Sequence, residues 1–242
     1  MDGVQEQTGE SDAQHPRRGA KTLIEFAYKS LRKDIISGEL APGSKLRIEH
    51  LRAKYEIGSS TLREALTLLV ADALVISEGQ RGFKVAPISL EDLKDVTRMR
   101  KMMETMALME AIENGDDHWE GGIVAAFHRL SRIEERLHDD CKQFADDWEE
   151  RNNAFHQALI SACPSRWVLH FREILYHQSE RYRRFSLISA SVSRDVHAEH
   201  KAIMDATLAR DKEQAGKLLD EHMDRTLTHL TSLLADSLPE RS

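Results

Sequence analysis

The stretch AKYEIGSSTLREALTLLVADALV, residues 53–75, contains the end of one helical pattern, a short break and the start of another. The break falls at the small residues Gly58 to Ser60, and the pattern after it has apolar side chains at helical spacing. Thr61 with Glu64 three residues later has the form of a capping box, although Ser60 would serve equally well as the cap. A tight break between two short helices is typical of a helix-turn-helix.

The sequence on either side of this stretch predicts the remaining elements of a small domain. Upstream, a helix is expected over residues 22–37, with an inward face made by Leu23, Ala27, Leu31 and Ile35. A second, shorter helix is expected from about Ile48 to Tyr55. Downstream, LVISEGQRGFKVAPIS (residues 74–89) alternates on both sides of a glycine-bearing turn and predicts a β-hairpin. Three helices and a hairpin make a winged helix-turn-helix.

In such motifs the N-terminal end of the third helix enters the major groove of DNA. The side chains expected to project from this end are those of Ser59, Ser60, Thr61 and Arg63. Short hydroxyls bond phosphates or base edges, a helix N-terminus attracts phosphate, and arginine can contact guanine in two places. The alternative for Arg63 is an ordinary solvated helix face.

The composition of the whole chain limits the class of protein that it can be. Of the 242 residues, 40% are apolar and 31% charged, which suits a soluble globular protein of one or two domains. No segment approaches the roughly 18 apolar residues of a membrane span, and the N-terminus carries no secretory signal, so no membrane is expected as a partner. The two cysteines, Cys141 and Cys163, have no metal-type spacing and fit reduced thiols in the cytoplasm.

The charge is unevenly distributed between the two halves. Residues 21–88 hold 11 Lys and Arg against 8 Asp and Glu, a net of +3, whereas residues 89–242 hold 21 against 29, a net of −8. A basic segment joined to a larger acidic one suggests a nucleic-acid-binding module attached to a different kind of domain. Chance is the alternative, because +3 is a modest excess.

After residue 89 the sequence predicts only helices. The expected helices follow Ser89, a candidate cap, and cover about 90–115, 120–139, 142–162, 165–186, 194–209 and 212–236. Six helices with short joints imply an antiparallel bundle. The first helix carries Met99, Met103, Met106 and Met109, which we interpret as core residues, with an adaptable partner surface as the alternative.

Histidines carry the clearest chemistry of this half, where ten of the 12 lie. Asn152 and His156 are four residues apart, hence on one helix face, while His200 and His222 lie on separate later helices. Three imidazoles from three helices could hold a divalent metal and leave coordination positions open. Polar core or surface histidines are the alternative. An open three-histidine site could also activate water for hydrolysis, but no HExxH-type pairing supplies a general base.

The run from Ile35 to Ser89 resembles the DNA-binding domain of GntR-family bacterial transcription regulators. The matching pieces are the SGELAPGSKLR opening, the TLREAL helix and the QRGFKVAP wing. The resemblance implies contact with a double-stranded DNA operator through Arg47, Ser60, Thr61, Arg63, Arg81 and Gly82. Many members have arginine where this chain has Ser59, so the operator sequence does not carry over from relatives.

The half from about 92 to 236 resembles the ligand-sensing FCD domain found in one branch of that family. This resemblance implies a divalent metal, zinc or nickel-like, held by Asn152, His156, His200 and His222. Asn152 takes the place of the family's aspartate and brings no charge, which should weaken the site. The resemblance also implies a small carboxylate effector near Arg100, to which ERYRRF would add Tyr182 and Arg183.

Several sequence motifs, including RYR and KLR…TLREAL, resemble those of the subgroup that includes the carbon-starvation-induced regulator of glutarate and 4-aminobutyrate use. That resemblance implies a short dicarboxylate as the effector.

Together these features predict a mainly α protein, with an N-terminal winged helix-turn-helix followed by an antiparallel all-α bundle of the FCD kind. The expected organisation is a tail over 1–20, a DNA-binding domain over 21–88, an effector-binding and dimerisation domain over 89–236, and a tail over 237–242. The expected function is a cytoplasmic, ligand-responsive regulator, a repressor that binds a near-palindromic operator as a homodimer and is not an enzyme. The alternative is a three-histidine metal hydrolase with an accessory nucleic-acid module.

Overall fold

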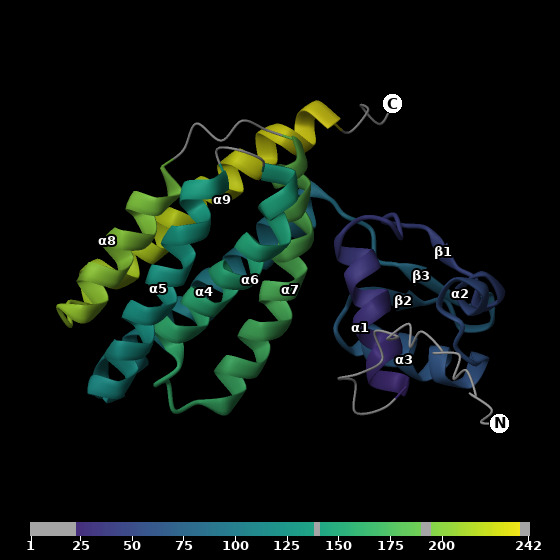
Figure 1. Cartoon of the computed structure of the whole chain (residues 1–242), viewed down its shortest axis with the longest axis horizontal. Helices are drawn as coiled ribbons and strands as arrows, with labels where there is room; N and C mark the ends of the chain where they lie inside the picture. The colour runs from purple at the N-terminus through teal and green to yellow at the C-terminus, as the bar shows by residue number, and fades with distance from the viewer. Residues whose placement is uncertain (1–22, 138–140, 190–194, 238–242) are drawn as a thin grey trace, which may run out of the picture.

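The computed structural model describes residues 23–137, 141–189 and 195–237, which form a smaller N-terminal head and a larger helical bundle beside it (Figure 1). The head contains α1 (Leu23–Ile36), β1 (Lys45–Leu46), α2 (Ile48–Tyr55), α3 (Ser59–Ala71), β2 (Val75–Ser77), the 3-10 turn η1 (Gly79–Arg81) and β3 (Phe83–Val85). The bundle contains α4 (Leu90–Asn114), α5 (Asp117–Leu137), α6 (Cys141–Ile160), α7 (Arg166–Ser189), α8 (Val196–Leu208) and α9 (Lys212–Ser237). The predicted fold class is confirmed.

Two predictions concern segments that are not described. The tail over residues 1–20 lies outside the described residues, and so does the tail over 237–242 apart from Ser237, where α9 ends. Between these limits the six bundle helices begin and end close to the predicted bounds.

The head is a three-helix unit closed by a small antiparallel sheet in the order β1-β3-β2. The predicted hairpin is present, with Val75 opposite Val85 and Ser77 opposite Phe83. The sequence did not reveal β1, because a strand of two residues is too short to show alternation. It pairs with the far edge of β3, and this pairing brings the start of α2 beside the hairpin.

Two details of the head differ from the prediction. The third helix begins at Ser59, with Gly58 as the extended N-cap, so the predicted cap at Ser60 or Thr61 is wrong. Because the helix starts earlier, both residues lie inside its first turn, where their side chains are not placed to cap it. Leu23 is the second correction, because it is 53% exposed at the first position of α1, beyond the face that α3 covers. Ala27, Leu31 and Ile35 are buried as expected.

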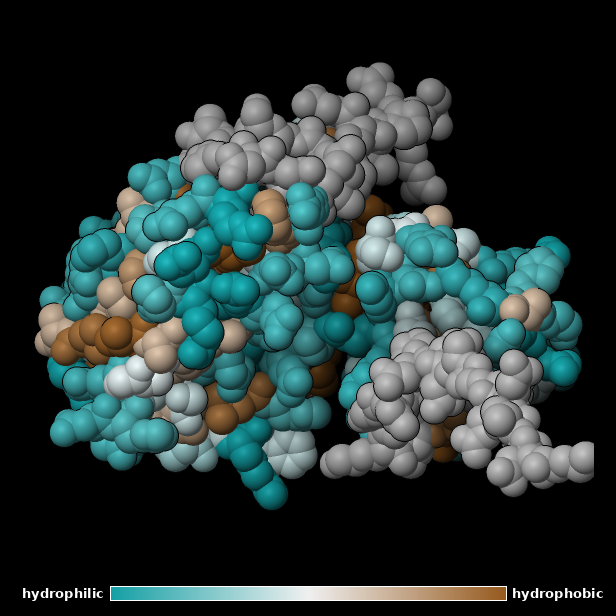
Figure 2. Space-filling model, in the orientation of Figure 1, coloured by the Kyte–Doolittle hydropathy of each residue, from teal (hydrophilic) through white to brown (hydrophobic). Residues whose placement is uncertain are grey.

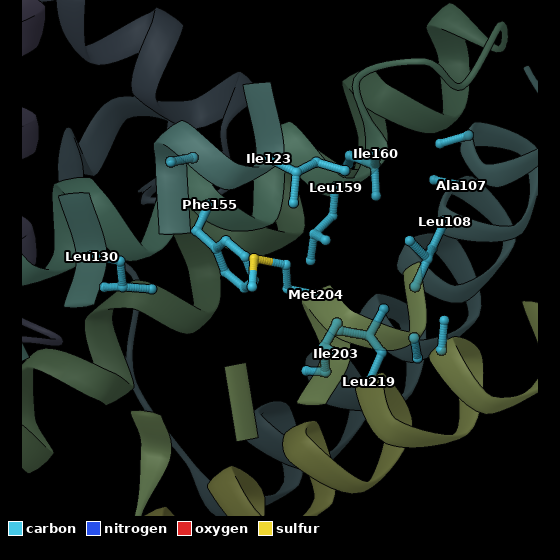
Figure 3. Packing of buried hydrophobic residues seen from close by; sticks show 14 of the residues in the cluster. Ala107, Leu108, Ile123, Leu130, Phe155, Leu159, Ile160, Ile203, Met204 and Leu219 are labelled. Carbon is cyan, nitrogen blue, oxygen red and sulfur yellow. The ribbon is translucent and has the colours of Figure 1, made fainter. Parts of the chain in front are cut away.

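Apolar side chains from five helices fill the centre of the bundle. Figure 3 shows Leu108 of α4, Ile123 and Leu130 of α5, Phe155 and Leu159 of α6, Ile203 and Met204 of α8, and Leu219 of α9. Burial of these side chains supplies the main driving force for the helices to associate. On the face shown in Figure 2 the surface is mainly hydrophilic, with separate hydrophobic patches. Within the described ranges, the helices are too short or too polar to cross a membrane.

Helix α4 presents a different face to the bundle from the one its methionines suggested. Met106 and Met109 are 41% and 38% exposed, so their assignment to the core is wrong. The buried face instead includes the polar residues Arg100 and Glu104. Arg100 and Glu104 therefore point into the bundle. The apolar pattern of the sequence had predicted that the face with Met106 and Met109 would do so.

The N-terminus of α4 is capped as predicted, because the Ser89 hydroxyl accepts a hydrogen bond from the backbone N–H of Asp92 at 3.1 Å. We expect Ser89→Ala to lower the free energy of unfolding by about 1 kcal/mol, since removal of a serine cap leaves a helix N–H unsatisfied. Urea denaturation followed by circular dichroism measures this loss. Ser131→Ala is the control, because the Ser131 hydroxyl only returns to a carbonyl within its own helix. An equal loss in both variants would contradict the assignment.

Candidate functional site

The N-terminal end of α3 lies at the surface of the head. Leu62, Leu66 and Leu69 are buried against the rest of the head, and the opposite face of the helix is exposed. Arg63 and Ser60 are on this exposed face, one turn or less from the helix start. The first turn carries no acidic residue, so the positive end of the helix dipole is not neutralised locally. This end of α3 therefore suits an anion such as a DNA phosphate.

The remaining predicted DNA contacts lie at the edges of the same head. Arg47 is the exposed residue that precedes α2, and Arg81 is exposed at the end of the turn between β2 and β3. Gly82 follows with φ of +90°, a conformation that side chains rarely adopt, so glycine is required for the wing to turn here. The predicted residues thus form the leading end of a helix and the tip of a wing.

Three histidines from three helices meet inside the bundle. His156 of α6, His200 of α8 and His222 of α9 are all buried, and one ligand nitrogen of each lies within 4.8 Å of those of the other two. The ring centroids are 4.8 to 5.4 Å apart. The structure brings together the histidines that the sequence singled out, in a group able to hold a metal ion.

Two carboxylates orient these imidazoles. The Nδ1 atom of His200 is 2.8 Å from Glu134, and the Nδ1 atom of His222 is 2.8 Å from Glu199. Each carboxylate accepts a hydrogen bond from Nδ1–H, so the metal-binding lone pair of each ring is on Nε2. Neither glutamate was singled out from the sequence, and Glu199 beside His200 in AEHK was the available clue.

The buried polar atoms of this region fit a metal. The Nε2 atom of His200, the Nδ1 atom of His156 and the Oδ1 atom of Asn152 have no hydrogen-bond partner among the described residues. Unsatisfied buried acceptors are costly, and a bound cation would satisfy them. Burial lowers the pKa of His156 well below its usual value, and the charges of His222 and His200 lower it further. His156 is therefore neutral near pH 7, the form that binds metal.

A cluster of buried arginines adjoins the histidines. The guanidinium carbons of Arg100, Arg172 and Arg183 lie 5.2, 4.5 and 4.4 Å from the ring centroid of Tyr176, within cation–π range. The Tyr176 hydroxyl accepts a hydrogen bond from the Asn152 amide at 3.2 Å. Asn152 therefore joins the arginine cluster to the histidine group, and its free oxygen belongs to the same polar interior.

Two glutamates only partly balance these arginines. Glu104 pairs with Arg100 at 2.8 Å, and Glu149 pairs with Arg183. Burial raises the pKa of Glu104, but the charges of Arg100 and Arg172 outweigh it and hold the pKa below its usual value. Within this cluster, three arginines against two glutamates leave an excess of one positive charge. A buried charge needs a partner, so the cluster is suited to an anionic ligand.

Arg172, like Tyr176, Glu104 and Glu149, belongs to this cluster but was not predicted from the sequence. Its Nε and Nη2 atoms are buried and make no hydrogen bond within the described ranges, although Nε is 3.6 Å from Glu104. The signal was present on α7, because residues 172, 176, 179 and 183 follow steps of four, three and four and so share one face.

Tyr182 lies elsewhere, and its assignment to the effector site is corrected. The Tyr182 hydroxyl donates to Asp92 at 2.6 Å, and its ring packs with Leu93, Leu230 and Leu234. It occupies the next position along α7 from Arg181, on a different face of the helix from Arg183. Tyr182 stabilises the start of α4 instead of lining the arginine cluster.

Comparison with known proteins agrees with this arrangement. The chain matches the family of bacterial regulatory proteins of the gntR type over residues 23–85 and the FCD domain over residues 95–225. The HTH-type transcriptional regulator BphR of Paraburkholderia xenovorans (strain LB400) is 45% identical over 213 residues, which cover 88% of this chain and 87% of BphR. The HTH-type transcriptional repressor GlaR of Escherichia coli (strain K12) is 38% identical over 200 residues, which cover 81% of this chain and 90% of GlaR.

Solved structures share the fold. The structure of E. coli McbR/YncC superposes with a TM-score of 0.72 at 20% identity, covering 87% of this chain and 98% of that one. A GntR-type transcriptional regulator of Rhodococcus sp. RHA1 gives a TM-score of 0.69 at 21% identity, covering 86% and 97%. At these identities the likeness concerns the fold alone.

A winged helix-turn-helix joined to a helical FCD bundle defines a DNA-binding transcription regulator. The chain belongs to the GntR family of bacterial regulators, in the branch that carries an FCD domain. This is a family of transcription regulators and not of enzymes, and its members act on DNA in the bacterial cytoplasm.

Proposed function

We propose that the protein is a ligand-responsive repressor that binds a near-palindromic operator as a dimer. The exposed N-terminal end of α3 is the observation that carries this proposal. Arg63 reads a base edge in the major groove, while Ser59, Ser60 and Thr61 contact phosphates or base edges near it. Arg47 and the wing residues Arg81 and Gly82 contact the DNA on either side, and the two copies of α3 lie about one helical turn apart.

The bundle is the sensor in this proposal. His156, His200 and His222 hold a divalent metal, zinc or nickel-like, with Asn152 offering a neutral oxygen. A bound metal supplies positive charge and open coordination positions for a carboxylate. Two guanidinium nitrogens of Arg172 have no hydrogen-bond partner among the described residues, and together with Arg100 and Arg183 they support a second carboxylate contact beside the metal.

A short dicarboxylate suits this combination. One carboxylate would face the metal and the other the arginines, which together carry an uncompensated positive charge. The subgroup resemblance of the sequence points to the same ligand class. The hydrolase alternative is set aside, because the chain belongs to a regulator family and Glu134 and Glu199 are engaged in orienting histidines.

Helix α7 supports a route from the sensor to the head. Its residues Tyr176 and Arg183 belong to the arginine cluster, whereas Gln178 and Arg181 between them contact the head. Gln178 donates to the backbone carbonyl of Asp72, the residue after α3, at 2.5 Å. Arg181 donates to the carbonyl of Ala86 at the end of the wing. A shift of α7 on ligand binding would therefore move both DNA-contacting elements.

Glu180 is central to this contact. It accepts a hydrogen bond from Arg32 of α1 at 3.0 Å and lies beside His177. Burial raises the pKa of Glu180, but the hydrogen bond with His177 and the charges of Arg32 and Arg183 outweigh it and lower the pKa to about 2. The stabilisation from ionised Glu180 is thus present above its ordinary pKa and is lost only as the pH falls toward about 2. The contact is intact at neutral pH.

We expect Glu180→Gln to reduce the effector response while leaving metal content unchanged. In wild type, a coupling of about 1–3 kcal/mol corresponds to a change of roughly 5- to 150-fold in DNA affinity on effector binding. Loss of the Arg32 ion pair should bring this change below about 3-fold. Fluorescence anisotropy with and without effector measures it. Glu173→Gln is the matched control, because Glu173 is exposed on the same helix. A full response in Glu180→Gln would exclude this route.

Native mass spectrometry of freshly purified protein tests the proposed function as a whole. The expected spectrum shows two chains, two divalent metal ions and a retained small acid. Apo-protein that binds neither zinc, nickel nor any short dicarboxylate on addition would refute the sensor.

A further inference from the structure

The N-terminal half of α7 exposes three aromatic side chains that neither the sensor nor the DNA-contacting residues use. Trp167 and Phe171 are 58% and 49% exposed, and His170 is exposed beside them. The Trp167 and Phe171 rings are stacked, with centroids 6.0 Å apart, and the His170 ring lies 6.0 and 5.7 Å from theirs. These three residues form what we call the aromatic platform. A contiguous exposed patch of this kind marks an interaction site, whereas scattered apolar residues do not.

The aromatic platform continues the face of α7 that already contacts the head. Two adjacent rows run along this face at helical spacing, one through residues 167, 171, 174 and 178 and the other through 170, 173 and 177. Near the C-terminal end of the first row, Gln178 donates to the backbone carbonyl of Asp72. In the second row, His177 contacts Arg32 of α1. The platform occupies the N-terminal ends of both rows, so it is continuous with the interface between head and bundle.

Helix α1 runs beside α7 in the same direction. Arg32 contacts His177 and Glu180, which are 145 and 148 residues further along the chain. One turn earlier on α1, Tyr28 lies near Glu173. Burial is the main cause that raises the pKa of Tyr28, and the charge of Glu173 adds to it. A step back along α1 is therefore matched by an equal step back along α7.

One turn further back, this register brings the start of α1 opposite the aromatic platform. The offset of 145 places Glu25 opposite His170. The offset of 148 places Leu23, which is 53% exposed, opposite Phe171. Arg166 at the start of α7 brings a positive charge to the same end as Glu25. Figure 1 shows α1 and α7 diverging toward their N-terminal ends, so the facing residues are apart in this structure.

We propose that the head closes against the bundle, so that the start of α1 packs on the aromatic platform of α7. The contacts around Arg32 act as the hinge, and Leu23 covers Phe171 in the closed form. Burial of these exposed apolar side chains drives the closure. The opposite charges of Glu25 and Arg166 favour its register. The structure described here is the open form.

Closure turns α3 relative to the bundle, because α1 and α3 share the core of the head. Ala27 and Leu31 of α1 are buried in the same cluster as Leu62 and Leu66 of α3. The head therefore moves as one unit, and its two positions hold the exposed end of α3 at different angles. This consequence for DNA binding rests on the proposed function, whereas the closure itself requires neither operator nor effector.

Disulfide trapping within one chain tests the closure. The variant Glu25→Cys/His170→Cys, with Cys141 and Cys163 changed to serine, is treated with a mild oxidant. Intact-mass spectrometry distinguishes a disulfide inside one chain from one between two chains. The disulfide inside one chain should form at least about 10-fold faster than in Lys33→Cys/His170→Cys, because residue 33 lies about 12 Å further along α1. A disulfide that forms only between chains, or equally fast in both variants, would overturn the closure.

A charge on the platform provides the second measurement. Phe171→Asp in the Glu25→Cys/His170→Cys background should slow the disulfide at least about 10-fold, because closure would bury a carboxylate against Leu23. Val124→Asp is the matched control, because Val124 is also 49% exposed but lies on α5. Its rate should stay within about 2-fold of the background, with unchanged circular dichroism in both variants. Equal rates in the two variants would refute the role of the platform.

The outcomes separate the closure from the proposed function. A chain that never forms the disulfide, but binds its operator and responds to a short dicarboxylate, would refute the closure alone. A chain that forms the disulfide at the expected rate and yet binds no operator would support the closure and refute the proposed function.

Discussion

Arg63→Ala is expected to bind the operator at least about 30-fold more weakly than wild type. A bidentate arginine–guanine contact is worth about 1–3 kcal/mol, and a dimer loses two of them. Arg63 is exposed and makes no ion pair within the described residues, so its removal should leave the fold unchanged. Fluorescence anisotropy on a labelled promoter duplex measures the affinity, and circular dichroism checks the fold.

The matched control for this variant is Arg129→Ala. Arg129 is also an exposed helical arginine, but it lies on α5, on the far side of the bundle from the head (Figure 1). The operator affinity of Arg129→Ala should stay within about 2-fold of wild type. If Arg63→Ala binds as tightly as Arg129→Ala, α3 does not read the operator through this residue.

His200→Ala is expected to lose more than nine-tenths of its bound metal. The variant removes one of three imidazole ligands and leaves two histidines and a neutral amide, which hold zinc poorly. Metal analysis of dialysed protein by mass spectrometry measures the loss. His197→Ala is the control, because His197 lies on the same helix and also contacts Glu134, but it is about half exposed. A similar metal content in both variants would contradict the site.

A variant with the opposite expected effect is Asn152→Asp, which should bind metal more tightly. The aspartate would add a negative charge where Asn152 now presents an unpartnered neutral oxygen. Competition with a chelator should reveal an increase of about 10-fold or more. A decrease would mean that the residue at this position does not face the metal, even if the three histidines do.

The head could be predicted closely because local patterns determine it. Each of its three helices has its own apolar face, and the glycine-bearing turn between residues 78 and 82 specifies the hairpin. The capping box at Thr61 and Glu64 failed because Ser59 and Ser60 can start a helix as well as cap one. The strand β1 was missed because its pairing with β3 is a tertiary contact with no local signal.

The interior of the bundle was only partly predictable from the sequence. The three histidines were identified mainly through the resemblance to the FCD domain, because ten histidines in this half allow many triples by spacing alone. The glutamates that orient them resemble any surface glutamates. The three arginines around Tyr176 are distributed over two helices, α4 and α7. Which face of each helix points inward depends on the packing of its neighbours. The same uncertainty placed Tyr182 in the site and Met106 in the core.

The affinity of the purified protein for the duplex upstream of its own coding region, compared with an unrelated duplex of equal length, tests the central claim most directly. At about 150 mM salt we expect the upstream duplex to bind at least about 1000-fold more tightly. Addition of metal and a short dicarboxylate should change that affinity about 5-fold or more. Equal affinity for both duplexes, unaffected by either addition, would contradict the account.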